Sequence, residues 1–203
     1  MKIIKPSFKI EGRVNGAQIL KNLERYGRTC YKSEGKITND SAEKLIESIL
    51  KCGHESVIEH EKITVRVICD RGVTHEIVRH RIGSYSQEST RYCNYNSRGI
   101  QVIKPLFFAP NTKQYKTWLD AMIACETAYN KLVESGASPQ EARSVLPNSL
   151  KTEIVITYNL REWRHFFKMR CSKRAHPQMR EIAIPMLKKF QTMVPIIFDD
   201  IML

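Results

Sequence analysis

The stretch TEIVITYNLREWRHFFKMR, residues 152–170, decides the fold class of this chain. Over 152–158 every second residue is apolar or threonine, which predicts a β-strand with one buried face. Asn159 is a favourable residue to precede a helix, and Glu162 stands three positions later. A helix is therefore expected to begin directly after the strand and to run to about Arg170.

Working outward, the same two periods recur along the chain. Alternating apolar residues predict a second strand over 63–69. Apolar residues at helical spacing, together with end signals, predict helices over 15–27, from 40 to about 51, over 72–80, 112–135 and 138–146, and from 176 onward. Pro185 should kink or interrupt the last of these. We predict one α+β domain over residues 1–203, with a small antiparallel or mixed sheet packed with helices and one long helix over 112–135.

Two helix starts rest on paired capping residues. Asp40 has a glutamate, Glu43, three positions later, which resembles a capping box. Ser138 is followed by a proline at the first helical position and by Glu141 at the third, a pattern typical of a helix N-terminus.

The composition limits the function classes. The 203 residues are 42% hydrophobic, and 33 Lys and Arg against 21 Asp and Glu leave a net charge of +12. This balance excludes a disordered or strongly acidic chain and favours anionic partners. No apolar run approaches the roughly 20 residues that span a bilayer, and no secretory leader is visible, so we expect a cytoplasmic protein without a membrane segment. The six cysteines are widely spaced and are expected to be reduced thiols.

The densest polar cluster runs from Arg79 to Tyr92. It holds three arginines and one histidine, interleaved with hydroxyl and amide side chains. A guanidinium group offers a bidentate fork to a phosphate, and hydroxyl groups add short neutral donors, so the pattern indicates an anion-binding loop. Composition alone equally allows a charged surface segment or an RNA-contacting loop.

Two further clusters carry polar residues that could bind ligands. His54 and His60 flank two glutamates, but a zinc protease motif needs histidines four positions apart, and these are six apart. We therefore predict no metal site. The helix expected after Asn159 carries basic residues at both ends, which could hold a long ligand; the alternative is an ordinary cap with solvated basic residues. Arg143 stands on an otherwise apolar helix and is costly to place without an anionic partner.

Together, these motifs resemble those of the flavin-dependent thymidylate synthases. The signature of that family is similar to Arg79-His80-Arg81, then seven residues, then Ser89 and Arg91-Tyr92. The resemblance extends in family order to Gly53-His54-Glu55-Ser56 with Glu59-His60, to Ala142-Arg143, to Asn159-x-Arg161 and to Arg170.

The resemblance implies an enzyme that converts dUMP to dTMP. FAD would be the redox carrier, 5,10-methylenetetrahydrofolate the carbon donor and NADPH the reductant. It also implies a homotetramer whose active sites are shared among subunits. These small molecules are all anionic, which would give the charge of +12 a use other than nucleic-acid binding.

The resemblance also implies roles for individual residues. Those expected to hold dUMP are Glu76, Arg79, Gln87, Glu88, Ser89, Thr90, Arg91, Arg143 from another subunit, and Arg170. Those expected to hold FAD are His54, Ser56, Arg79, His80, Arg81, Gln87, Asn159, Arg161 and His165. Arg170 is the expected catalytic residue, because a guanidinium against the uracil carbonyl and N3 favours the ionised ring. Ser89 is expected to donate a hydrogen bond to dUMP, since no histidine–acid pair accompanies it as a nucleophile.

Three residues depart from those common in the family: Glu76, Ser86 and His165. A carboxylate would repel a phosphate, so Glu76 is expected to reach a uracil or ribose donor instead. Two rival functions stay open. One is an RNA- or DNA-binding module that uses the basic cluster with Arg98, and the other is a flavoprotein of the same fold without synthase activity.

Overall fold

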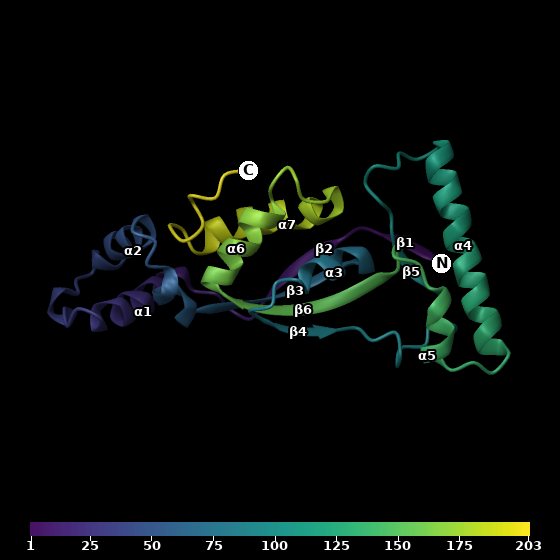
Figure 1. The fold of residues 1–203 in the computed structure, drawn as a ribbon, viewed down its shortest axis with the longest axis horizontal. Helices are drawn as coiled ribbons and strands as arrows, with labels where there is room; N and C mark the ends of the chain where they lie inside the picture. Colours follow the sequence, from purple (N-terminus) through teal and green to yellow (C-terminus); the bar gives the residue numbers. More distant parts are fainter. The chain divides into compact units, whose positions relative to one another are not determined.

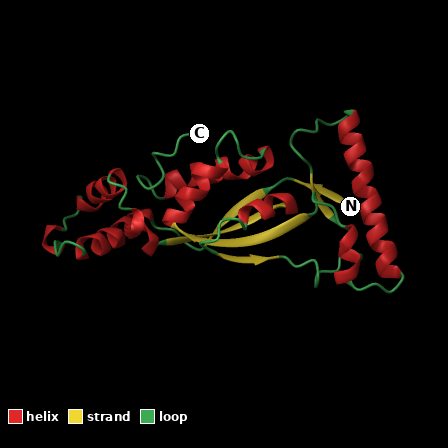
Figure 2. Cartoon of the chain, in the orientation of Figure 1, coloured by secondary structure: helices red, strands yellow, loops and turns green.

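The computed structural model describes residues 1–203 and contains both helices and strands (Figure 1, Figure 2). The strands are β1 (Lys2–Ile4), β2 (Ser7–Glu11), β3 (Lys62–Asp70), β4 (Ser84–Gln87), β5 (Gln101–Ile103) and β6 (Lys151–Asn159). The α-helices are α1 (Gly16–Thr29), α2 (Ser41–Lys51), α3 (Arg71–Ile77), α4 (Lys113–Glu134), α5 (Pro139–Ala142), α6 (Leu160–Arg170) and α7 (Pro177–Met193). Short 3₁₀ helices are η1 (Glu34–Lys36), η2 (Glu55–His60) and η3 (Arg143–Val145).

The strands form two sheets. β1 pairs in parallel with β5, with Ile3 opposite Val102. The other sheet has four antiparallel strands in the order β2-β3-β6-β4. The predicted α+β class with a small mixed sheet is therefore confirmed. No helix combines the length and the apolar character needed to cross a bilayer.

The chain folds into two compact units, and each is assembled from separate segments. The first unit comprises Met1–Phe8, Arg66–Arg79 and Tyr85–Val155. The second comprises Lys9–Val65, His80–Ser84 and Ile156–Leu203. The long strands β3 and β6 each contribute residues to both units, and the single domain expected over 1–203 stays a prediction.

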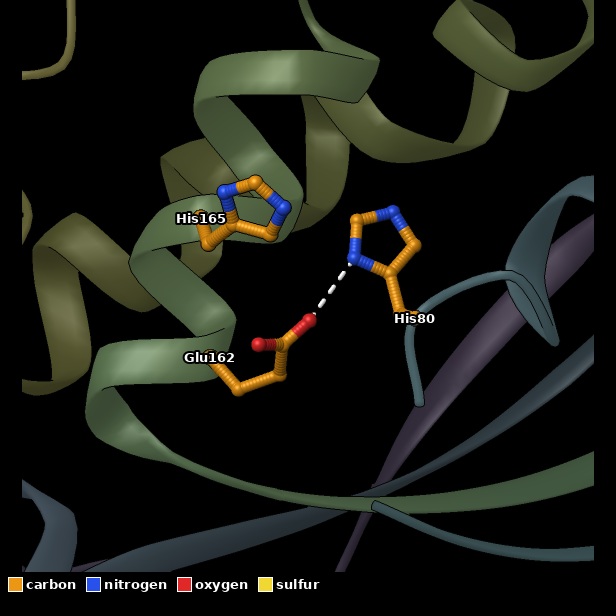
Figure 3. A group of neighbouring side chains, drawn as sticks. All are labelled: His80, Glu162 and His165. Carbon is orange, nitrogen blue, oxygen red and sulfur yellow. Dashed lines mark hydrogen bonds and ion pairs between the residues drawn. The ribbon is translucent and has the colours of Figure 1, made fainter. Parts of the chain in front are cut away.

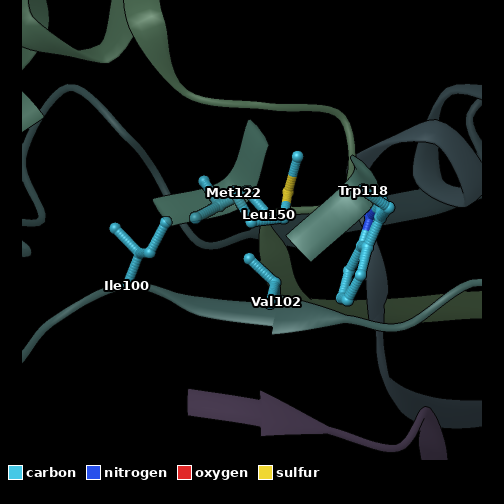
Figure 4. Packing of buried hydrophobic residues seen from close by; sticks show 5 residues of the cluster. All are labelled: Ile100, Val102, Trp118, Met122 and Leu150. Atoms are coloured by element: carbon cyan, nitrogen blue, oxygen red, sulfur yellow. The ribbon is translucent and has the colours of Figure 1, made fainter. Parts of the chain in front are cut away.

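The core of the first unit forms where α4 meets strand β5. Trp118 and Met122 of α4 pack with Val102 of β5 and with Ile100 and Leu150, all nearly enclosed (Figure 4). The predicted long helix is confirmed. The hydroxyl oxygen of Thr112 accepts a hydrogen bond from the backbone N–H of Tyr115 at 3.2 Å and so caps α4.

An aromatic core holds the second unit together. Trp163 and Phe167 of α6 pack against Phe190 of α7 and Phe198 of the C-terminal segment, with ring centroids 5.0 to 5.8 Å apart. Buried Arg164 extends from α6 to this segment, where it bonds to the carboxylate of Asp200 at 2.6 and 2.7 Å. The segment after α7 is thereby attached to α6.

Three local predictions differ from the structure. Asp40 makes no side-chain cap on α2; instead the hydroxyl oxygen of Ser41, the first residue of the helix, accepts from the backbone N–H of Thr38 at 2.8 Å. α3 ends at Ile77 rather than near His80. α7 continues through Pro185, so the helix is not interrupted there, while the alternative of a kink stays a prediction. In contrast, the capping pair at the start of α5 is confirmed, since Glu141 accepts from the Ser138 backbone N–H at 2.8 Å.

Candidate functional site

The junction of β6 and α6 positions one group of functional side chains. The side-chain oxygen of Asn159 accepts from the backbone N–H of Glu162 at 2.8 Å, so the helix begins directly after the strand, as predicted. The backbone N–H of Leu160 donates to the carbonyl oxygen of Glu61 at 2.9 Å. Because this bond ties the start of α6 to the end of η2, residues 55–60 lie beside the first turn of α6.

A buried histidine links the two ends of α6. His80 Nδ1 lies 2.8 Å from Glu162 Oε1 near the helix start (Figure 3). Nε of Arg170, at the helix end, donates to His80 Nε2 at 3.0 Å. The ring of His165 lies with its centroid 5.3 Å from that of His80 (Figure 3). His80 and Glu162 are 5% and 7% exposed, so this arrangement is largely shielded from water.

These contacts define the protonation of His80. Arginine can only donate, so Nε2 of His80 must accept from Arg170, and the ring proton must lie on Nδ1 and point at Glu162. Burial lowers the pKa of His80 below its usual value, and the repulsion by Arg170 acts in the same direction, while the hydrogen bond to Glu162 opposes them. The result is a neutral imidazole in one tautomer, joined to Arg170 at one nitrogen and to Glu162 at the other.

His80, Glu162 and His165 also meet a geometric condition for a metal site, since one ligand atom from each lies within 4.8 Å of the others. An ion bound by His80 would have to displace Glu162 or Arg170 from it, and it would then lie close to the Arg170 guanidinium. The arrangement thus favours a hydrogen-bonded group, and the predicted absence of a metal stays a prediction.

A cleft of about 530 Å³ in the second unit opens beside this group. Its lining carries three carboxylates and three cations together with an imidazole, an amide and one exposed aliphatic side chain: Glu55, Glu59, Glu162, Arg161, Arg164, Lys168, His165, Asn159 and Ile82. Arg161 donates to Glu59 at 2.6 Å, and this bond raises its pKa above the usual value. Arg161 and Lys168 keep about half of their side-chain surface exposed, at 51% each, and can therefore still reach a ligand.

The predicted nucleotide loop, Gln87 to Arg91, belongs to the first unit. The Gln87 amide donates to the hydroxyl oxygens of Thr74 and Thr152 at 3.1 and 3.2 Å. The Glu88 carboxylate accepts from the Tyr95 hydroxyl at 2.8 Å and from Lys151 at 2.7 Å. The backbone N–H of Glu88 also donates to the carbonyl oxygen of Glu153 at 2.8 Å, so both the side chain and the backbone of Glu88 are bonded within the protein, and its contact with dUMP stays a prediction.

The rest of this loop has a turn conformation. Ser89 Oγ accepts from the backbone N–H of Arg91 at 3.2 Å, and the Arg91 guanidinium lies 5.5 Å from the centroid of the Tyr92 ring. Thr90 is buried, and Arg143 Nη1 lies 3.5 Å from its hydroxyl oxygen within the same chain. The loop therefore presents Ser89 and Arg91, and Arg143 of η3 lies beside Thr90 of the same chain, while the contribution of Arg143 to another subunit stays a prediction.

The predicted site residues therefore fall into two sets. The first unit contains Glu76, Arg79, Gln87, Glu88, Ser89, Thr90, Arg91 and Arg143, and the second contains His54, Ser56, His80, Arg81, Asn159, Arg161, His165 and Arg170. In the second set, Asn159, Arg161 and His165 line one cleft, whereas His54, Ser56 and Arg81 are solvent-exposed. The imidazole nitrogens of His80 are both bound by protein groups, so its side chain could meet a flavin only through its ring carbons.

Sequence reasoning missed the partner of His80. Glu162 was interpreted only as a capping residue, and its spacing of three from His165 was the one available signal that it shares a helix face with a functional residue. The sequence separation of 82 between His80 and Glu162 gave no local signal. Glu55, Lys168 and Ile82 were likewise not predicted to line the cleft.

Comparison with known proteins agrees with this fold. Residues 17–196 match the family model described as thymidylate synthase complementing protein. The flavin-dependent thymidylate synthase of Geobacter sulfurreducens is 37% identical over 180 residues, which cover 85% of this chain and 78% of that protein. The enzyme of the same name from Pyrococcus furiosus is 35% identical over 170 residues, covering 82% of this chain and 70% of that protein.

A solved structure has the same fold. It is the UMP/dUMP methylase PolB of Streptomyces cacaoi bound with 5-Br dUMP, which superposes with a TM-score of 0.81 at 21% identity, covering 98% of this chain and 96% of that one. The fold and the site thus define an α+β protein of the thymidylate synthase complementing class. The chain belongs to this family, and its relatives from Geobacter sulfurreducens and Pyrococcus furiosus are flavin-dependent thymidylate synthases.

The cleft residues suit a flavin nucleotide. A diphosphate takes N–H donors, which Arg161, Lys168 and His165 can supply. The exposed side chain of Ile82, 66% accessible, offers an apolar contact to a flat ring. Because the formal charges of the lining balance, the diphosphate would have to draw Arg161 partly away from Glu59.

Proposed function

We propose that this protein catalyses the reductive methylation of dUMP to dTMP, with FAD as redox carrier, 5,10-methylenetetrahydrofolate as carbon donor and NADPH as reductant. Membership in a family whose compared members are named flavin-dependent thymidylate synthases supports the reaction. In this chain, the observation that carries the proposal is the hydrogen bond between Arg170 and buried His80. His80 is the middle residue of the Arg79-His80-Arg81 motif.

Each group in the proposal has a chemical task. Arg170 would face the uracil carbonyl and N3, where a cation lowers such a pKa by about 1 to 3 units and makes C5 more nucleophilic. Ser89, Arg91 and Arg143 would bind the nucleotide, whose phosphate suits their hydroxyl and guanidinium donors. Bound FAD would supply hydride transfer, and Asn159, Arg161 and His165 would hold it in the cleft.

The visible absorption spectrum of the purified protein tests the proposal. Flavin bands should be present, or should appear after FAD is added and survive gel filtration. Anaerobic NADPH should bleach them, and it should do so faster when dUMP is present, because one site would then serve cofactor and nucleotide. A protein that stays colourless after FAD addition and binds RNA in a salt-dependent manner would contradict the synthase and favour the nucleic-acid rival.

Replacing the proposed catalytic residue gives a sharper prediction. Arg170→Ala should abolish dTMP formation and leave bound flavin in place, because the guanidinium is assigned to the pyrimidine and not to the cofactor. The measurement is dTMP production with a parallel flavin spectrum. Arg174→Ala, which changes an exposed arginine four positions away, is the matched control and should keep wild-type turnover. Retained turnover in Arg170→Ala would remove the assignment.

A flavoprotein without synthase activity is the second candidate. The same spectroscopic experiment would then show flavin that NADPH reduces at one rate with or without dUMP, and no dTMP would form after methylenetetrahydrofolate is added.

A further inference from the structure

One hydrogen bond of Arg170 is made by its Nε atom, which is not one of the two terminal amino groups of the guanidinium. The Nε–H donates to Nε2 of His80 at 3.0 Å. A guanidinium group presents its bidentate fork through its terminal amino groups, and the direction of the fork changes with rotation about the Cδ–Nε bond. A hydrogen bond at Nε restricts this rotation and so sets the plane of the group.

The partner that holds Arg170 is itself held. His80 can accept at Nε2 only when its proton is on Nδ1, and Glu162 accepts that proton at 2.8 Å. In the other tautomer Nε2 would carry a hydrogen and would face the Arg170 donor. Glu162 therefore selects the one form of His80 that can bind Arg170, although the two residues are 82 positions apart in the chain.

Burial makes this arrangement costly for a purely structural role. His80 is 5% exposed and Glu162 is 7% exposed, and a carboxylate in such a place loses most of its hydration. The surrounding Phe166 and Tyr158 rings, with centroids 5.1 and 6.1 Å from that of His80, would pack equally well against apolar side chains. A directional requirement at Arg170 explains why polar groups are used here.

We propose that Glu162 and His80 are positioning residues for Arg170. Glu162 fixes the tautomer of His80, and His80 in that tautomer fixes the guanidinium plane that faces dUMP. The inference rests on the proposed function, because it assigns to the pair a task in nucleotide recognition by Arg170. Glu162 and His80 make no bond to the reacting atoms in this scheme. They act only on the orientation of the Arg170 guanidinium.

The first test compares Glu162→Gln with Glu24→Gln. The amide is nearly isosteric with the carboxylate but can also donate to Nδ1, which permits the tautomer that cannot accept from Arg170. Glu24 is a matched control, because it is also buried, at 2% exposed, and bonds to Arg28 at 2.8 Å, and neither residue of this pair lines the cleft. With flavin-loaded full-length protein, Glu162→Gln should weaken dUMP binding by between about 10- and 100-fold, the range expected for one misdirected hydrogen bond from a charged group. The control should bind as the wild type does.

A double-mutant cycle tests whether the effect passes through Arg170. Lysine has no planar fork, so Arg170→Lys removes the guanidinium plane that the bond to His80 orients while keeping a positive charge. Adding Glu162→Gln to Arg170→Lys should then change dUMP binding by less than about twofold. An undiminished further loss in the double variant would overturn the proposed route through Arg170.

A measurement without nucleotide separates this inference from the proposed function. Magic-angle-spinning NMR of the full-length protein labelled with [15N]histidine should show a neutral His80 with a protonated Nδ1, assigned by loss of the signal in His80→Gln. Glu162→Gln should shift the Arg170 Nε–H resonance, and Glu24→Gln should leave it unchanged. A His80 proton on Nε2, or an unmoved Arg170 resonance, would overturn the inference even if dTMP is made. If the spectra are as expected but the wild type does not bind dUMP, the proposed function is refuted, and with it the task assigned to the pair.

Discussion

His80 combines two protein partners with an almost complete lack of solvent contact, and its protonation is therefore tied to folding. Burial, reinforced by Arg170 and His165, lowers its pKa, while Glu162 opposes this shift. In the unfolded chain the imidazole has its ordinary pKa near 6.5. Below that pH the unfolded state binds a proton that the folded state does not, so the stability present above pH 6.5 is lost as the pH falls toward the lowered folded-state value.

We therefore expect the free energy of unfolding to fall when the pH is lowered from 7.5 to 5.5. The slope due to His80 can reach about 1.4 kcal/mol per pH unit within this window. Urea unfolding at the two pH values, for the wild type and for His80→Gln, measures it. The variant should be less stable at pH 7.5 but should show a flatter pH dependence. Equal slopes in the two proteins would mean that another group causes the loss.

Ser89 allows a second prediction for a single residue. Its Oγ accepts from the Arg91 backbone at 3.2 Å, so its hydroxyl hydrogen can be directed at a ligand. Ser89→Ala should weaken dUMP binding about 3- to 10-fold, the value of one neutral hydrogen bond, and should keep bound flavin. Calorimetric titration with dUMP measures this, with Ser97→Ala as an exposed control in the same unit. Isolation of a covalent Ser89–nucleotide adduct would contradict the donor role.

At the level of elements, helix starts decide where functional side chains lie. The cap that Asn159 places on the Glu162 backbone begins α6 directly after β6, and this start determines that Glu162, His165 and Arg170 follow at helical spacing. The local signal was sufficient here because the capping residue and its partner are three positions apart. At α2 the same kind of signal misled us: Thr38 and Ser41 hydrogen-bond to each other, and Asp40 makes no side-chain cap.

Helix α4 offers a clean test of capping. Thr112→Ala removes the hydroxyl that accepts from Tyr115 and should destabilise the protein by about 1 kcal/mol. Thr117→Ala in the same helix removes a hydroxyl that only donates back to the Lys113 carbonyl, and it should be neutral or slightly stabilising. Thermal melts of both variants against the wild type provide the comparison. An equal loss in the two would show that threonine volume, rather than the cap, matters.

For the whole molecule, the expected sharing of sites among subunits is the property to test. Arg143 belongs to the first unit and Arg170 to the second. If four copies of the 23.6-kDa chain assemble and each site takes these arginines from different copies, mixed tetramers can recover intact sites.

We predict that Arg143→Ala and Arg170→Ala, each inactive alone, regain activity when they are unfolded together and refolded as mixed tetramers. With random assembly, each of the two arginines of a site is intact in about half of the sites. Both are therefore intact in about one quarter of the sites, so up to about a quarter of wild-type turnover should return. Each variant refolded alone is the control. An absence of recovery in mixtures whose tetramers are shown to be hybrid would place both arginines of a site on one chain.

The sequence by itself determined those features that depend on neighbours along the chain. Alternation over 152–158, capping at Asn159 and Ser138, and the apolar stripe of α4 each involve residues within one or two turns, so their signals survive without tertiary context. Short strands such as β1 and β4 lack this redundancy, because three or four residues carry too little periodicity and are held by their partners in the sheet.

Only the tertiary structure decided how the functional side chains interact. It bound the Glu88 carboxylate to Tyr95 and Lys151, and it placed buried His80 between Glu162 and Arg170. These contacts join residues far apart in the chain, and their energies come from burial and from hydrogen-bond direction, neither of which a linear pattern contains. Sequence could propose Arg170 as the group that acts on the substrate, but only the folded chain supplies the buried imidazole and carboxylate that orient it.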